Sequence, residues 1–154
     1  MFNYWTVKDN LLVKNFYINK NKISNNKCYF IADIAANHDG DLNRAMELIY
    51  MAKEAGADAV KFQHFKAETI VSDFGFKKVG SKLSHQETWK KSIYEVYKDV
   101  EVPLTWTEIL HKTCKKANID FFTSPYDINE MDEINNFISA YKVGSGEITF
   151  HVIV

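Results

Sequence analysis

Four short apolar segments of this sequence each lead into polar side chains. These side chains are Asp33 at the end of CYFIAD, Lys61 and Gln63 in AVKFQ, Ser124 at the end of IDFFTS, and Lys142, Ser145 and Glu147 in YKVGSGE. Two lysines, an amide and two hydroxyls suit a ligand that carries both a phosphate and a carboxylate. The glycines beside Ser145 leave backbone N–H groups free to cradle an oxyanion, although many ordinary turns contain the same string.

Strand periodicity predicts which of these side chains share a face. Alternate residues of a strand point the same way, so Lys61 and Gln63 share one face, as do Tyr29, Ile31 and Asp33. A buried lysine needs an anion beside it, because an unpaired charge in a low-dielectric site costs roughly several kcal/mol. That anion is either a ligand phosphate or Asp33 in a purely structural pair, and the periodicity leaves both open.

Alternating strands and helices must position these residues. The expected strands are 29–34, 59–63, 119–123 and 140–143. Near-continuous apolar strands in this order predict an α/β fold with a parallel sheet, either doubly wound or a (β/α)8 barrel. A barrel needs eight strands and about 250 residues, so four strands would make half of one.

Local signals predict the remaining boundaries. Residues 1–27 alternate loosely between apolar and polar and indicate a β-hairpin or extended arm that precedes the barrel segment, 28–154. The polar connection 64–86 is longer than packing requires and is a candidate cover for a substrate. Side-chain caps predict helix starts at Asp41, at the capping boxes Ser84–Glu87 and Thr105–Glu108, and at Asp127.

Composition and charge narrow the function classes. With 46% hydrophobic and 25% charged residues over 154 positions, the sequence is typical of a soluble globular protein with one core. A net charge of −1 without a long block of one sign argues against nucleic-acid binding or a polybasic membrane anchor. No apolar run approaches the roughly 20 residues that span a bilayer. Two well-separated cysteines and no secretory signal predict a cytoplasmic protein with free thiols.

Four strings in a fixed order resemble one known family. IADIAANHDGDL, AGADAVKFQ, IDFFTSPYD and AYKVGSGEIT are similar to the sialic acid synthase family, which comprises N-acetylneuraminate synthase and its legionaminate and pseudaminate relatives. The resemblance covers about residues 28 to 150. It implies an N-terminal (β/α)8 barrel that condenses phosphoenolpyruvate with an open-chain, N-acetylated amino sugar and releases phosphate. It also implies a C-terminal antifreeze-like domain and a homodimer in the full-length family.

The resemblance also implies roles for individual residues. The positions matching the family's phosphoenolpyruvate site are Lys61, Gln63, Ser124, Lys142 and Ser145. Glu147 matches a carboxylate that stabilises positive charge at C2 of phosphoenolpyruvate or handles a proton. Asp33 stands where a glutamate that contacts the sugar and its attacking water is usual, and its side chain is one methylene shorter. Asn37 and His38 match positions that line the site, although an NHDG loop can equally serve only to stabilise its own turn.

The resemblance further implies a divalent metal, manganese or magnesium, whose histidine ligands lie outside this sequence. None of the five histidines has metal-ligand spacing, so none is assigned to a metal. We therefore expect these 154 residues alone to be an inactive part of such a synthase. The alternatives are a non-catalytic, phosphate-binding half-barrel that oligomerises, and another phosphoenolpyruvate aldol synthase of the octulosonate or heptulosonate phosphate type.

Overall fold

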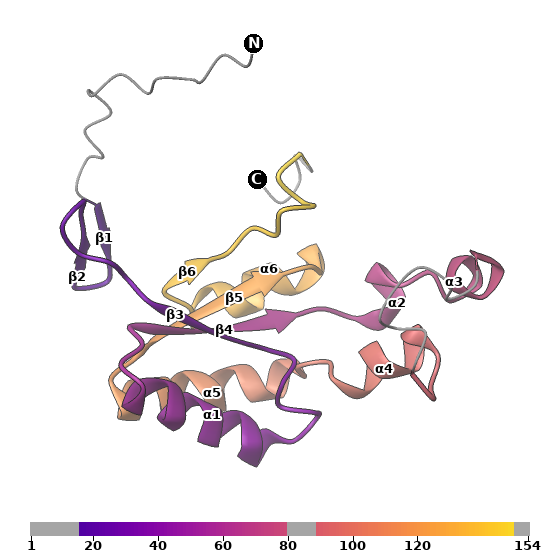
Figure 1. Ribbon diagram of the computed structural model, residues 1–154, viewed down its shortest axis with the longest axis horizontal. Helices are drawn as coiled ribbons and strands as arrows, with labels where there is room; N and C mark the ends of the chain where they lie inside the picture. The colour runs from indigo at the N-terminus through magenta and orange to yellow at the C-terminus, as the bar shows by residue number, and fades with distance from the viewer. Residues whose placement is uncertain (1–15, 80–88, 150–154) are drawn as a thin grey trace, which may run out of the picture.

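The centre of the molecule is a four-stranded parallel sheet (Figure 1). The computed structural model describes residues 16–79 and 89–149. The strands are β3 (Ile31–Ala35), β4 (Ala59–His64), β5 (Asp120–Pro125) and β6 (Ala140–Tyr141), and each is hydrogen-bonded to the next along the chain. A doubly wound sheet reverses its strand order and carries helices on both faces. Here the order does not reverse, so the fold is that of the (β/α)8 barrel family.

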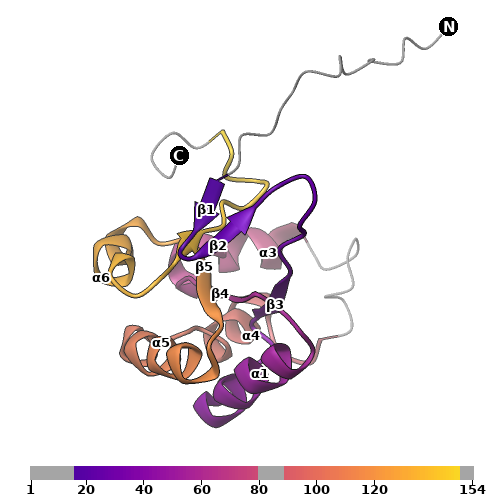
Figure 2. The same cartoon turned by 90° about the vertical axis from the view of Figure 1, so that its left-hand side faces the viewer.

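Helices cover one face of this sheet (Figure 2). Helix α1 (Leu42–Glu54) packs against α5 (Leu104–Ala117), which in turn contacts α6 (Met131–Asn135). The core between sheet and helices is built from Ile34, Ala45, Ile49, Val60, Phe62, Val102, Leu110, Cys114, Ile119 and Phe121. Because Val60 and Phe62 point into this core, the alternation of a strand directs Lys61 and Gln63 to the opposite face, which is the interior side of a barrel.

Two of the four predicted helix starts agree with the structure. The Asp41 side chain caps α1 by accepting hydrogen bonds from the N–H groups of Asn43 and Arg44, and Gly56 follows the helix with φ of 90°. Asp127 caps η2 (Ile128–Glu130), which runs directly into α6. The caps thus position the turns that follow β3 and β5.

Neither of the two predicted capping boxes is found in the described structure. The Ser84–Glu87 box lies outside the described residues, and helix α4 (Ile93–Asp99) instead begins with a capping box of Ser92 and Glu95. The Thr105 box is wrong. Proline 103 occupies the N-cap of α5 with φ of −62°, so the helix has already begun at Leu104 and Thr105 falls within its first turn. The connection after β4 contains two short helices, α2 (Ala67–Ile70) and α3 (Asp73–Val79).

An antiparallel hairpin precedes the sheet, as expected. It consists of β1 (Phe16–Ile18) and β2 (Asn21–Ile23). The side-chain amides of Asn19 and Asn21 donate to the carboxylate of Asp120, the first residue of β5, at 2.7 and 2.8 Å. The hairpin therefore lies at the amino end of the sheet, opposite the end at which β4 leads into α2 (Figure 1).

Two other expectations concern cysteines and membranes. Both cysteines are free, with Cys28 exposed and Cys114 buried in the core. Burial raises the pKa of the Cys114 thiol to about 12. Within residues 16–79 and 89–149, no helix is both long and apolar enough to cross a membrane.

Acid should destabilise the fold through His64. This ring is fully buried between Thr123 and Thr107, at 2.7 and 3.0 Å, and burial lowers its pKa from 6.5 to about 4. The unfolded chain therefore binds more protons than the folded one between these pH values. The stabilisation is complete above pH 6.5, and we expect a loss of about 3 kcal/mol as the pH falls to 4.

Urea unfolding at several pH values measures this loss. A His64→Gln variant keeps a polar side chain without the titration, so its unfolding free energy should depend less steeply on pH over the same window. Equal slopes for the two proteins would contradict the assignment to His64.

Candidate functional site

Lys61 and Asp33 form an ion pair on the interior face of the sheet, midway along β4 and β3. The Lys61 Nζ lies 2.8 Å from Asp33 Oδ1, and the two residues are register partners on neighbouring strands. The Lys61 side chain is only 6% exposed, whereas that of Asp33 is 63% exposed. The cation is thus buried and its partner is largely hydrated, so an incoming anion can reach the lysine from the open side.

Strand β3 is irregular where it presents Asp33. The register with β4 shifts between Asp33 and Ala35, and Ala35 has φ of 49°. Such left-handed backbone costs a residue with a Cβ about 1–2 kcal/mol. Irregular pairing of this kind re-aims a side chain and ends the ladder, and here it leaves the carboxylate facing Lys61.

Tyrosine 126 joins the site residues, although its role was not predicted. Its hydroxyl interacts with Gln63 and Ser124. Burial raises the pKa of this phenol, the charges of Glu147 and Asp33 raise it further, and the neighbouring Gln63 and Ser124 side chains lower it. The phenol is therefore neutral at physiological pH and can donate a hydrogen bond. The missed signal was the period of two that places Phe122, Ser124 and Tyr126 on one face.

Glycine 144 makes room for Glu147. A Cβ at position 144 would lie 1.7 Å from Glu147 Oε2 and 3.3 Å from the Tyr126 hydroxyl. The carboxylate thus folds back over the buried glycine and lies beside the phenol. Glycine is needed at position 144 because any side chain there would collide with the Glu147 carboxylate.

The remaining anion-binding candidates differ in exposure. Ser124 is fully buried, and its Oγ makes no hydrogen bond of standard geometry with a described residue, even though the Tyr126 hydroxyl is close enough to interact. Lys142 and Ser145 are exposed on the segment that follows β6. The Lys142 backbone N–H donates to the Thr123 carbonyl at 2.9 Å, which keeps this segment alongside β5.

Asparagine 37 and His38 lie in different surroundings. Asn37 lines a cavity of about 350 Å³ together with Gln63, and its side-chain amide donates to the Ile34 carbonyl at 2.9 Å. His38 is fully buried and packs against Phe62 and Trp106, on the helical side of the sheet. Asn37 therefore lies beside Gln63, whereas His38 lies on the other face of the sheet.

Comparison with known proteins identifies the family of this chain. Residues 48–154 match the NeuB family. The chain belongs to the NeuB family. Among similar NeuB-type proteins, N,N'-diacetyllegionaminic acid synthase of Legionella pneumophila is 37% identical over 123 residues, 79% of this chain and 34% of the relative. The enzyme of the same name from Campylobacter jejuni is 38% identical over 80% of this chain and 36% of its own length.

The fold is likewise shared with solved structures. The N-acetylneuraminic acid (sialic acid) synthetase of Leptospira borgpetersenii, crystallised with citrate, superposes with a TM-score of 0.70 at 26% identity. The match covers 90% of this chain and 44% of that protein. This NeuB chain spans about a third of the length of the curated relatives it matches.

Substitutions at the ion pair should have unequal effects on stability. Asp33→Asn leaves the buried Lys61 charge unpaired, and we expect it to lower the unfolding free energy by about 2–3 kcal/mol. Lys61→Met removes the buried charge and leaves Asp33 hydrated, so the free energy should stay the same or rise. Urea unfolding at pH 7 measures both.

A surface pair provides the control. Lys77→Met breaks the exposed ion pair with Asp73 and should change the unfolding free energy little. If Lys61→Met destabilised the protein as much as Asp33→Asn, the pair would be structural and its lysine would not be held for a ligand.

Proposed function

We propose that this chain forms the phosphoenolpyruvate-binding part of a synthase that makes a nonulosonic, sialic-type acid from an N-acetylated amino sugar. The observation that carries the proposal is the buried Lys61 cation, whose ion-pair partner among the described residues is a carboxylate that is 63% exposed. Membership of the NeuB family, with relatives named as legionaminic acid synthases, supports the choice of reaction.

In the proposed reaction, C3 of phosphoenolpyruvate attacks the aldehyde carbon of the open-chain sugar. The carbonyl oxygen takes a proton, and C2 becomes cationic. Water adds to C2 and gives up one proton, and the C2–O bond to phosphate then breaks while the new hydroxyl passes its remaining proton to the departing phosphate, which leaves a 2-keto acid and hydrogen phosphate. The protein must therefore bind a trianion, stabilise a transient cation and accept a proton.

The carboxyl-end residues suit these three tasks. Lys61 and Lys142 supply positive charge for the phosphate and carboxylate, and Gln63, Ser124 and Ser145 supply neutral donors. Glu147, held against Gly144, supplies negative charge for the cation at C2. Once the substrate anion pairs with Lys61, Asp33 contacts the sugar and the attacking water.

A divalent metal is part of the reaction that the family resemblance implies. Among residues 16–79 and 89–149, no three histidine, cysteine, aspartate or glutamate side chains are grouped so as to hold an ion. The described side chains therefore do not form a metal centre. The roles proposed for Lys61, Glu147 and Asp33 do not require a metal bound by these residues. Manganese or magnesium ligands from outside this sequence remain part of the proposal.

Calorimetric titration with phosphoenolpyruvate tests the proposal. The 154-residue chain should bind it, and Lys61→Gln should weaken binding at least about tenfold, because a charge-assisted hydrogen bond is lost. Lys53→Gln is the matched control, since Lys53 is exposed in the last turn of α1, beside the amino end of the sheet. Equal affinities for the chain and both variants would contradict the site.

Phosphate release distinguishes the two forms of the proposal. With phosphoenolpyruvate, N-acetylmannosamine and manganese, we expect no turnover by the 154 residues alone, because the described sheet contains four of the eight strands of a barrel. Robust turnover would overturn that expectation. Binding without turnover by a stable homodimer, seen by light scattering, would favour the non-catalytic half-barrel.

A further inference from the structure

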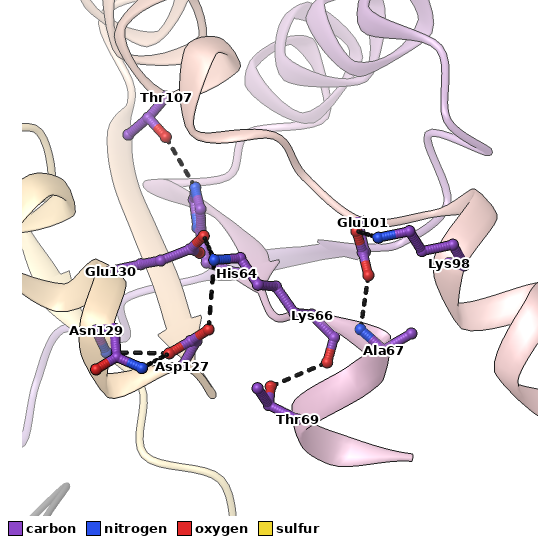
Figure 3. A network of polar contacts seen from close by, with 10 residues as sticks. All are labelled: His64, Lys66, Ala67, Thr69, Lys98, Glu101, Thr107, Asp127, Asn129 and Glu130. Carbon is purple, nitrogen blue, oxygen red and sulfur yellow. Dashed lines mark hydrogen bonds and ion pairs between the residues drawn. The ribbon is translucent and has the colours of Figure 1, made fainter. Parts of the chain in front are cut away.

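The chain around Tyr126 is fixed on both sides to the loop that leaves β4. The Tyr126 N–H donates to the His64 carbonyl at 2.8 Å, so the two strand ends remain paired one residue beyond β5. The His64 ring is itself held by Thr107 (Figure 3) and by Thr123. The backbone of Tyr126 is thus anchored directly to the end of β4, which carries Gln63.

Asp127, the residue after Tyr126, forms an ion pair with Lys66, which also pairs with Glu130. Lys66 lies 2.9 Å from Glu130 Oε1 and 3.7 Å from Asp127 Oδ2, and both carboxylates are more than nine-tenths buried (Figure 3). Asp127 also accepts hydrogen bonds from the backbone and side chain of Asn129, at 3.0 and 3.1 Å. Two buried carboxylates depend on one cation from the neighbouring loop, so Lys66 ties the β4 and β5 loops together.

The Lys66 loop is fixed in its turn. The Ala67 N–H donates to Glu101 Oε1 at 2.6 Å, and Glu101 pairs with Lys98 at 3.0 Å (Figure 3). The β4 loop therefore has its own support from the segment between α4 and α5. As a result, the chain on both sides of Tyr126 is held by hydrogen bonds and ion pairs to the β4 loop.

This support aims a neutral hydroxyl into the proposed anion site. The Tyr126 hydroxyl interacts with Gln63 and Ser124 and lies beside Glu147, all on the interior face of the sheet. A neutral donor is useful here because a carboxylate or phenolate would repel the substrate anion, whereas an O–H donates to it. Packing alone would be served by a phenylalanine.

We propose that Tyr126 is a further substrate-binding residue, whose hydroxyl donates to an anionic oxygen of phosphoenolpyruvate, and that Lys66 is the residue that positions it. This inference rests on the proposed function and adds two residues to the site. Tyr126 contacts the ligand, whereas Lys66 acts only through the Tyr126 loop.

Calorimetry with phosphoenolpyruvate separates contact from packing. Tyr126→Phe keeps the ring and removes only the hydroxyl, and its affinity should fall about five- to tenfold. Tyr50→Phe is the matched control, because Tyr50 is about half exposed on α1, outside the described contacts of the site, and its affinity should not change. Lys66→Met should weaken binding when Tyr126 is present but should weaken it no further in the Tyr126→Phe background. Lys66→Arg, which keeps the positive charge, should bind phosphoenolpyruvate as tightly as the unmodified chain.

The outcomes separate the two proposals. No binding by the unmodified chain overturns the proposed function and this inference with it. Binding that Tyr126→Phe leaves unchanged overturns the inference alone. An equal loss from Lys66→Met in both backgrounds overturns the positioning role. If Tyr126→Phe does not fold, the tyrosine ultraviolet difference spectrum of the unmodified chain decides: phosphoenolpyruvate should perturb it, and an unperturbed spectrum contradicts the contact.

Discussion

A lysine ammonium buried on the face of a sheet can stay charged only if an anion lies against it, and this constraint governs the interior face of this sheet. Lys61 is 6% exposed and meets it through Asp33 at 2.8 Å. Replacing such a pair with apolar side chains often leaves stability unchanged or raises it. We therefore propose that the lysine is retained for a ligand rather than for stability, and that Asp33 holds the cation in place until that ligand binds.

The two ends of the sheet differ in how fully their polar groups are hydrogen-bonded. At the amino end, Asp120 accepts hydrogen bonds from Asn19 and Asn21 of the hairpin, so the polar groups there satisfy one another. At the carboxyl end, the Ser124 hydroxyl is buried without a hydrogen bond of standard geometry to a described residue, and Lys142 is exposed. Polar groups that the described protein leaves incompletely satisfied thus gather where (β/α)8 barrels place their active sites.

Strand periodicity was sufficient to predict much of this arrangement. The apolar strands and the Asp41 cap identified the β-α-β unit, and a period of two placed Lys61 and Gln63 on one face. Periodicity could not choose between a barrel and a doubly wound sheet, because that choice depends on which strands pair. It also could not place His38, whose burial against Trp106 depends on α5, or reveal that Gly144 makes room for Glu147. The predicted cap at Thr105 was wrong because Pro103 is the N-cap and the helix already begins at Leu104.

The central claim is that phosphoenolpyruvate replaces Asp33 as the partner of Lys61. Thermal unfolding with and without phosphoenolpyruvate tests it directly in the unmodified chain, Asp33→Asn and Lys61→Met. If the claim is right, the ligand raises the melting temperature most in Asp33→Asn, where it neutralises an unpaired buried cation, and least in Lys61→Met. The same rise in all three proteins would contradict it, because the ligand would then bind without contacting the lysine.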